Sequence, residues 1–254
     1  MNGNSGSEET PIEDADVVDQ QDPPPNEPPA APRSAGELIR QLADQIPDVA
    51  TVPAEAYRLA SEVRRLNAAV VLSDVDPKLL GATADAVARL TDILGQTQRD
   101  HLQIVRHPDG RVESMRNAGS GVLNPQAPPI EWITRPAAPA PGSPVQPVEV
   151  VARCTYTAAH GGSPGCVYGG VLALTLDEVT GIAIHASGAR GMTVALNVAL
   201  RGAVPIGVPV TITARYTGSE GRKSFATGTL TVDGRVSAEA SVIYVAERTA
   251  EDGG

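Results

Sequence analysis

The second half of the chain combines one long apolar run with several alternating segments. Residues 169–186, GGVLALTLDEVTGIAIHA, are almost continuously apolar, and their length and Leu/Ala content favour a buried helix. Segments rich in Val, Thr and Ile, separated by Gly, Pro or Asp-Gly, indicate strands. One such segment precedes the run and four follow it, at 148–157, 191–202, 207–218, 222–234 and 235–247. This order predicts an α+β fold in which an antiparallel sheet packs on one long helix.

Two amphipathic patterns lie nearer the amino terminus. Residues 53–72 and 77–104 carry apolar residues at steps of three and four, and each pattern begins with a proline, which the first helical turn tolerates. The apolar positions are Ala56, Leu59, Val63, Leu66 and Val70 in the first pattern, and Leu79, Leu80, Val87, Leu90, Ile93 and Leu94 in the second. Asp76 is placed to cap the second helix. We therefore expect an antiparallel helical hairpin within a helical extension at 34–106, with a weaker helix at 36–46.

The remaining segments are polar or rich in proline. Residues 107–147 are rich in Pro, Gly and Asn and predict a loop-rich linker, with one short edge strand at 129–134 (PIEWIT). Residues 1–33 hold eight acidic residues and one basic residue, so most of the net charge of −10 lies there. We expect this acidic, proline-rich tail and residues 248–254 to be disordered. The negative charge argues against a nucleic-acid partner.

No motif in the sequence indicates a membrane span or a cofactor. No apolar run reaches the ~18 residues that a spanning helix needs, and the amino terminus lacks the pattern of a secretory signal. Cys154 and Cys166 do not have the spacing of zinc ligands, and no phosphate-binding glycine pattern occurs. We expect a soluble, cytoplasmic protein with reduced cysteines and no metal or organic cofactor.

Several candidate catalytic residues lie on the predicted helix 169–186. Gly169 and Gly170 stand at its start, where unpaired N–H groups and partial positive charge can polarise a carbonyl; they could equally serve tight packing. Asp177, two turns on, is a carboxylate in an apolar stretch, where carboxylates are uncommon unless they are paired or functional. Glu178 is its rival, because adjacent helix positions point about 100° apart and only one can face a site.

The strand expected at 191–202 supplies two further candidates. If it alternates regularly, Thr193, Ala195 and Asn197 share one face. Thr193 and Asn197 are then polar side chains on the same face of this strand. The alternative is that the threonine only reflects the preference of β-branched residues for strands.

The segment YGGVLALTLDEVTG, residues 168–181, resembles the signature of the PaaI-type acyl-CoA thioesterases of the hotdog-fold superfamily: His-Gly-Gly, six residues, then Asp. GGSPGCVYGG (161–170) takes the place of the Gly-Pro-Pro-Gly that commonly precedes it. RNAGSGVLNPQAPPIEW (116–132) resembles the lead-in of actinobacterial members. The resemblance covers about residues 115–247 and departs at Tyr168, where the family usually has a histidine that helps position the thioester in some members.

The resemblance implies a hotdog domain at 148–247, an antiparallel sheet wrapped around one central helix, that hydrolyses acyl-CoA to a free acid and coenzyme A. Asp177 would be the general base for water or the nucleophile, and Thr193, contributed by the partner subunit, would hold the attacking water. It also implies a homodimer or a dimer of dimers. The implied site residues are Asp177, Gly169, Gly170 and Thr193 for catalysis, and Tyr168, Glu178 and Asn197 for substrate binding.

Other interpretations stay open. A non-catalytic hotdog protein that binds acyl-CoA or acts as a scaffold would fit Tyr168, whereas a hotdog dehydratase would need a His-acid pair that this helix does not supply. His160-Gly161-Gly162 matches the loop before the motif and not the motif itself. Cys166 and His185 are more simply explained by packing. Basic residues that could meet coenzyme A phosphates, or be ordinary surface, are Arg190, Arg201, Arg215, Arg222 and Lys223.

Overall fold

The computed structural model of the protein describes three stretches of the chain, residues 45–99, 103–140 and 143–246. The chain divides into two units, Met1–Gln41 and Leu42–Gly254, and every described residue belongs to the second. The predicted tail at 1–33, almost all of the helix expected at 36–46, and residues 248–254 lie outside the described residues.

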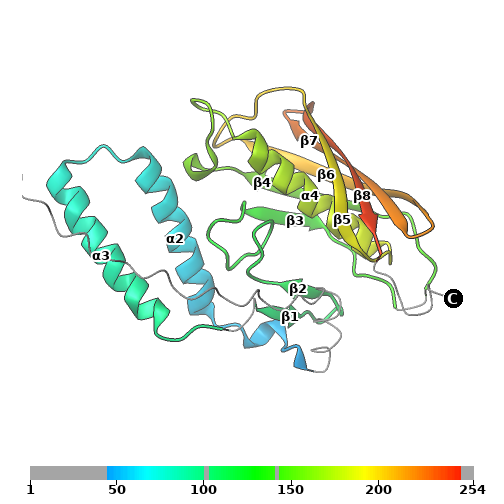
Figure 1. Cartoon of the computed structure of the whole chain (residues 1–254), viewed down its shortest axis with the longest axis horizontal. Coiled ribbons are helices and arrows are strands. Elements are labelled where there is room, and N and C mark those ends of the chain that lie inside the picture. The colour runs from blue at the N-terminus through cyan, green and yellow to red at the C-terminus, as the bar shows by residue number, and fades with distance from the viewer. Residues whose placement is uncertain (1–44, 100–102, 141–142, 247–254) are drawn as a thin grey trace, which may run out of the picture. The chain divides into compact units, whose positions relative to one another are not determined.

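The second half of the chain forms a six-stranded antiparallel sheet and one long helix (Figure 1). The elements are β3 (Ile130–Thr134), β4 (Glu149–Thr155), α4 (Gly169–Ala186), β5 (Met192–Leu200), β6 (Pro209–Glu220), β7 (Lys223–Val232) and β8 (Arg235–Val245). Their order across the sheet is β3-β4-β6-β7-β8-β5, so β3 and β5 are the two edges. Helix α4 contacts β4, β5, β6, β7 and β8. This is the predicted α+β hotdog fold.

The main core lies between α4 and the inner face of the sheet. In β4, β6, β7 and β8 buried residues alternate with more exposed ones over much of each strand, which is the periodicity that the sequence pattern predicts. Examples are Val150, Ala152 and Cys154 of β4, and Val210, Ile212 and Ala214 of β6, which cluster with Leu172, Leu176, Val179 and Ala183 of α4. Gly228 of β7 has a packing role, because a Cβ there would lie 2.9 Å from the Cγ2 of Thr180. A side chain at Gly228 would push the helix away from the sheet.

The turn between β7 and β8 is the tight hairpin that the sequence predicts. Val232 pairs with Arg235, and the two residues between them have positive φ angles, 47° at Asp233 and 75° at Gly234. Asp-Gly is a preferred pair where both central residues need φ above zero. The turn sets the register in which β7 and β8 begin to pair.

Both expected amino-terminal helices are present as α2 (Ala54–Leu72) and α3 (Pro77–Gly95). The Asp76 side chain caps α3 by accepting from the N–H groups of Lys78 and Leu79. Helix α3 ends at Gly95, earlier than the predicted residue 104, and glycine is a poor helix former. In the described part of the chain the two helices do not pack on each other as a hairpin. The apolar stripe of α3 stays exposed at Leu79, Leu80, Val87, Leu90, Ile93 and Leu94.

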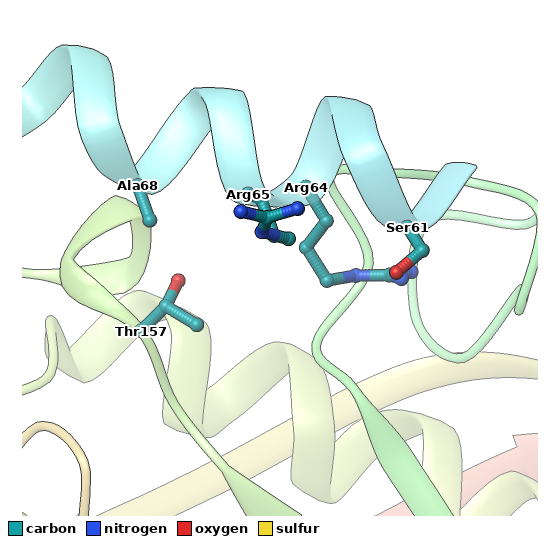
Figure 2. Close-up of a pocket in the computed structure, with 5 residues that line it drawn as sticks. All are labelled: Ser61, Arg64, Arg65, Ala68 and Thr157. Atoms are coloured by element: carbon teal, nitrogen blue, oxygen red, sulfur yellow. The ribbon is translucent and has the colours of Figure 1, made fainter. Parts of the chain in front are cut away.

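Helix α2 is fixed instead to a loop and to the short helix η3 (Ala158–His160). Arg64 donates to the carbonyl oxygen of Asn124 at 3.0 Å, and Asn67 donates to that of Pro125 at 3.4 Å. Between α2 and Thr157 lies an open cavity of about 290 Å³ (Figure 2). Its lining residues are Ser61, Arg64, Arg65, Ala68 and Thr157.

A small two-stranded sheet, which the sequence analysis missed, lies at the boundary between the expected helical extension and linker. β1 (Ile104–Arg106) pairs antiparallel with β2 (Val112–Ser114). The connection contains another Asp-Gly pair, with Gly110 at φ 83°. Val105 of β1 packs in a second, smaller core. Strands of three residues are too short for alternation to reveal them.

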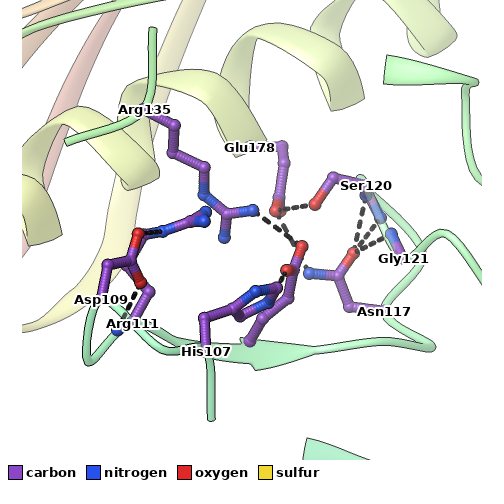
Figure 3. A network of polar contacts seen from close by, with 10 residues as sticks. His107, Asp109, Arg111, Asn117, Ser120, Gly121, Arg135 and Glu178 are labelled. Atoms are coloured by element: carbon purple, nitrogen blue, oxygen red, sulfur yellow. Dashed lines mark hydrogen bonds and ion pairs between the residues drawn. The ribbon is translucent and has the colours of Figure 1, made fainter. Parts of the chain in front are cut away.

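A buried ion network ties β2 to the residue that follows β3 (Figure 3). Glu113 accepts from Arg135 and from His107, each at 2.7 Å, and the side chains of Glu113 and Arg135 are only 12% and 8% exposed. Arg135 also lies over the ring of Trp132, 4.7 Å from its centre. Burial alone would raise the pKa of Glu113, but the charge and hydrogen bond of Arg135, with those of His107, outweigh it and hold that pKa below its usual range.

We expect Glu113→Gln to destabilise the protein by about 3 kcal/mol at pH 7, because it leaves the Arg135 charge buried without its partner. A depressed carboxyl pKa contributes stability above the ordinary glutamate pKa of about 4.3, and that stability is lost as the pH falls through the folded-state value. Urea unfolding should therefore show the parent and variant converging below about pH 4. Glu62→Gln is the matched control, since its ion pair with Arg65 is exposed. Equal stability of Glu113→Gln and the parent at pH 7 would contradict this prediction.

Candidate active site

The amino terminus of α4 presents free backbone donors. The helix begins at Gly169, and the Tyr168 side chain makes no capping hydrogen bond. Among the described residues we find no acceptor for the N–H groups of Gly169 and Gly170, as is usual for the first turn of a helix. Gly170 is exposed, so its N–H is open to a ligand, and the positive end of the helix dipole points the same way.

Tyr168 lies across this helix end. Its ring is packed against two glycines: a Cβ at Gly170 would lie 2.7 Å from the ring, and one at Gly162 would lie 2.9–3.0 Å from Tyr168 atoms. The side chain is nevertheless 61% exposed. Gly169 is also closely packed, since its Cβ would lie 2.8 Å from the Leu200 side chain. Both glycines therefore serve packing.

Gly161 and Gly162 belong to the loop that precedes α4. His160 is buried at the end of η3 and closes a capping box, in which its Nδ1 accepts from the Thr157 N–H at 3.1 Å. Gly162 then donates its N–H to the carbonyl oxygen of Cys166, which closes the tight loop before α4. Burial lowers the pKa of His160, so its ring is neutral at pH 7. This agrees with the prediction that His160-Gly161-Gly162 is the loop and not the motif.

Asp177 and Thr193 of one chain contact each other. Thr193 Oγ1 donates to Asp177 Oδ1 at 2.9 Å, across the contact between α4 and β5. Both side chains are half-buried. The contact is within one chain, whereas the resemblance implied a threonine from the partner subunit. Among the described residues Asp177 Oδ2 has no hydrogen-bond donor, so one carboxylate oxygen is held and the other is free.

Asn197 does not join them, and the prediction that it shares a face with Thr193 is wrong. Across the β5–β8 ladder Thr193 lies opposite Tyr244, but Ala195 lies opposite Ile243, so Val194 is an extra, bulged residue. A β-bulge shifts the alternation by one residue. Thr193 therefore faces α4 with the buried Tyr244, while Asn197, opposite the exposed Ser241, faces away.

Glu178 anchors a loop to α4 (Figure 3). Its Oε1 accepts from Ser120 Oγ at 2.5 Å and from Asn117 Nδ2 at 3.2 Å. Asn117 in turn accepts with Oδ1 from the N–H groups of Gly119, Ser120 and Gly121. The two neighbouring carboxylates thus have different surroundings: Glu178 holds the loop, and Asp177 meets Thr193. The segment RNAGSG, residues 116–121, carries no signal in the sequence that indicates this contact with Glu178.

The two parts of the candidate site, the N–H groups of Gly169 and Gly170 and the carboxylate of Asp177, lie apart within one chain. Asp177 is eight residues beyond Gly169 in a continuous helix, which places it about 12 Å along the helix axis. A general base must come within about 3 Å of the proton that it removes. One thioester cannot contact the Gly169–Gly170 donors and the Asp177 of the same chain at once. A single chain therefore holds two half-sites.

An apolar rim borders these half-sites along the open edge of the sheet. β5 is an edge strand, and no strand among the described residues pairs with its open side. Large apolar side chains are exposed on β5 and on the adjoining face of α4, namely Leu174, Met192, Val194, Leu196 and Leu200. Exposed apolar edges of this kind are normally paired or covered.

The remaining candidates have ordinary surroundings. Cys154 and Cys166 are both free, and burial raises the pKa of the Cys154 thiol to about 12, which makes it unreactive. His185 is largely buried, which lowers its pKa, and its ring lies edge-on to Tyr244. Arg201 and Arg215 are in surface ion pairs with Glu239 and Glu149.

The described residues contain neither a metal-binding group nor a membrane-spanning helix. No group of three or more His, Cys, Asp or Glu side chains there could hold a metal ion. Likewise, no helix in that part of the chain combines the length and the apolar character needed to cross a membrane.

Comparison with known proteins links the fold to one superfamily. No protein-family model and no curated protein sequence matches the chain. The crystal structure of a thioesterase superfamily protein is 25% identical, with a TM-score of 0.62 over 79% of this chain and 93% of that chain. Thioesterase superfamily member 2 from zebrafish is 24% identical over 52% of this chain and 89% of that chain, with a TM-score of 0.41. The same protein from Mus musculus is 19% identical over 46% of this chain and 80% of that chain, with a TM-score of 0.39. Both TM-scores are low.

The first of these likenesses is longer than the sequence resemblance. Residues 115–247 make up about half of the chain, whereas the aligned part is 79% of it, so the likeness extends into the elements before residue 115. The described structure therefore has the fold of a thioesterase superfamily protein, and the likeness includes residues of this chain before position 115.

Proposed function

We propose that the protein is a thioester hydrolase that cleaves acyl-CoA to a free carboxylic acid and coenzyme A. The observation that carries the proposal is the carboxylate of Asp177, held at one oxygen by Thr193 and free at the other, on the same helix as the open N–H groups of Gly169 and Gly170. The thioesterase superfamily fold supports the same reaction class.

The proposed reaction uses each half-site for one step. The thioester oxygen accepts from the N–H of Gly170 or Gly169, and the helix dipole stabilises the oxyanion that forms. Asp177 takes one proton from water, whose oxygen bonds to the carbonyl carbon. The carbon–sulfur bond then breaks, coenzyme A leaves as a thiolate and takes up a proton, and the acid remains. Direct attack by Asp177, followed by hydrolysis of the resulting anhydride, is the alternative route.

The separation of the half-sites supports a homodimer. Pairing two β5 edges about a two-fold axis would extend the sheet across both copies and bury the apolar rim. The two α4 helices would then run antiparallel, so that the donors of one copy meet the partner subunit's Asp177. The acyl chain and the pantetheine arm would lie between the copies. The exposed stripe of α3 offers a further surface for a dimer of dimers.

The direct test is release of free thiol from a panel of acyl-CoAs of different chain length. We expect turnover of at least one of them, with detection of coenzyme A by a thiol reagent and of the acid by mass spectrometry. No thiol release from any member of the panel, by a protein that binds acyl-CoA, would refute the hydrolase.

A protein that binds acyl-CoA but releases no thiol would have the second candidate function, that of a non-catalytic acyl-CoA-binding protein. Tyr168, at the position where the resembling family usually has histidine, is the observation that favours it. Tyr168→His separates the two: a functional tyrosine would make the exchange nearly neutral, whereas a lapsed enzyme would gain thiol release from near zero.

A further inference from the structure

Positive charge and hydroxyl groups line the cavity between α2 and Thr157 (Figure 2). Arg64 and Arg65 come from α2, Ser61 and Thr157 each add a hydroxyl, and none of the described residues that line the cavity is acidic. Guanidinium groups only donate hydrogen bonds, and hydroxyl groups can donate as well. The volume of about 290 Å³ is at the lower end of the range for ligand pockets, about 300–1,000 Å³. The cavity therefore suits a small anionic group with several acceptor oxygens.

Arg64 carries a charge that no carboxylate among the described residues balances. It donates to the carbonyl oxygens of Asn124 at 3.0 Å and Val122 at 3.5 Å, which are uncharged acceptors. Its Nε is buried and has no hydrogen-bond partner in the described part of the chain. Burial lowers the pKa of Arg64, and no neighbouring negative charge offsets this. A cation that has lost part of its water is costly unless an anion meets it, so Arg64 favours an anionic ligand.

Arg65 is available to the same ligand. Its ion pair with Glu62, at 2.7 Å, joins side chains that are 76% and 59% exposed. Exposed ion pairs of this kind contribute little to stability. An anion in the cavity can therefore replace the Glu62 carboxylate at small cost.

The cavity lies beside the loop that leads to the amino terminus of α4. Thr157 is the N-cap of η3, and the carbonyl oxygen of His160 at the end of η3 accepts the N–H of Tyr168 at 2.9 Å. Because a 3₁₀-helix rises ~2 Å per residue, Thr157 lies on the order of 10 Å from Tyr168. The pKa of His160 is lowered by its burial and also by the positive charge of Arg64, so this charge acts on the same loop.

We propose that Arg64 and Arg65 bind the phosphate groups of coenzyme A while the thioester lies at the amino terminus of α4. The identity of the ligand rests on the proposed function. In acyl-CoA a pantetheine arm separates the phosphates from the thioester, and its length is that of four extended residues, ~14 Å. The arm is thus long enough to join the two places. The guanidinium fork matches the oxygens of a phosphate, and charged donors of this kind make the stronger hydrogen bonds.

Arg64→Gln should raise KM for acyl-CoA and the Kd of free coenzyme A by about 10- to 100-fold, through loss of a hydrogen bond to a charged group. The change in kcat should be small, because the lost contact is remote from the reacting atoms. Arg65→Gln should raise both constants less, by about 5-fold, since Arg65 is exposed. Steady-state thiol release gives KM and kcat, and calorimetric titration with coenzyme A gives Kd.

An acyl-pantetheine is the matched substrate, because it has the thioester and the arm but none of the phosphates. Neither arginine variant should change its KM or kcat. Arg58→Gln is the matched control variant: it removes an exposed arginine from the same helix, and Arg58 does not line this cavity.

Two further variants and measurements keep the test independent of stability. Arg64 also fixes α2 to the loop at Asn124, so the melting temperature of Arg64→Gln is measured beside its Kd. Arg65 bonds only to Glu62 among the described residues, so Arg65→Gln tests the site with the fold intact. Glu62→Gln removes the competing carboxylate and should lower the Kd of coenzyme A.

Inorganic phosphate distinguishes a coenzyme A site from a site for the free ion. Phosphate alone should bind more weakly than coenzyme A, because it makes no contact at α4. Phosphate binding as tight as that of coenzyme A, and lost in Arg64→Gln, would assign the cavity to the free ion and overturn the inference.

Failure of this inference and failure of the proposed function give different results. Thiol release by the parent, with KM and Kd unchanged in both arginine variants, would overturn the phosphate site alone. Equal losses with acyl-CoA and acyl-pantetheine would also overturn it, since the effect would then come from the fold. A parent that releases no thiol but binds coenzyme A through Arg64 and Arg65 would overturn the hydrolase and keep the site. A parent that does not bind coenzyme A would overturn both.

Discussion

We expect Asp177→Asn to lower kcat for acyl-CoA by about 10²–10⁴-fold and to change KM little. The amide has nearly the shape of the carboxylate and can still accept from Thr193 through its oxygen, but it cannot take a proton from water. The loss therefore falls on the chemical step. Steady-state thiol release measures it, and protection against thermal unfolding by acyl-CoA shows that binding is retained.

Glu178→Gln is the control for Asp177→Asn, because it changes the adjacent carboxylate of the same helix. The glutamine oxygen can still accept from Ser120 and Asn117, so the loop stays anchored and kcat should change less than a few-fold. A parent-like rate in Asp177→Asn would mean that the carboxylate is structural. A larger loss in Glu178→Gln than in Asp177→Asn would exchange the roles of the two residues.

The parts of the fold that the sequence predicts are those with long, regular patterns. The run at 169–186 has the exact bounds of α4, because an apolar segment of that length has few other structures open to it. The β7–β8 turn follows from Asp233-Gly234, whose backbone conformation few other pairs adopt. The contact of Asp177 with Thr193 within one chain was not predicted, since the resemblance implied a threonine from the partner subunit and spacing alone does not say which strand meets the helix.

The parts that the sequence does not predict depend on single insertions or on distant contacts. One bulged residue, Val194, turns Asn197 to the opposite face, and period-two reasoning cannot see a bulge whose flanking residues are all strand-like. Tyr244 lies opposite Thr193 in the sheet only because β8 returns beside β5, which is a matter of topology. Glu113 and Arg135 form a buried pair across twenty-two residues, and neither has a neighbour in sequence that signals it.

Gly170→Pro should lower kcat/KM by about 10²–10³-fold, the cost of losing one oxyanion donor. Proline removes the backbone N–H but is tolerated in the first helical turn, where Gly170 makes no intrahelical donation. Gly170→Ala is the matched control, because its Cβ displaces the Tyr168 ring in the same way and keeps the N–H. If Gly169 is the donor, the large loss appears instead in Gly169→Pro.

Combining an Asp177→Asn chain and a Gly170→Pro chain in one dimer should restore activity. Co-expressed with different affinity tags, an Asp177→Asn chain and a Gly170→Pro chain form a heterodimer in which one site has both intact groups. That heterodimer should hydrolyse acyl-CoA at about half the parent rate, because one of its two symmetry-related sites is complete.

The matched control is a heterodimer of the parent chain with a chain that carries both substitutions. If each site takes its donors from one copy and its base from the other, every site in this control has one defect and the protein is inactive. If each site lay within one chain, the control would keep half of the activity and the first heterodimer would have none. The roughly 12 Å between Gly169 and Asp177 along α4 predicts the first pattern. The opposite pattern would require the helix to bend so that its own carboxylate reaches its own amino terminus.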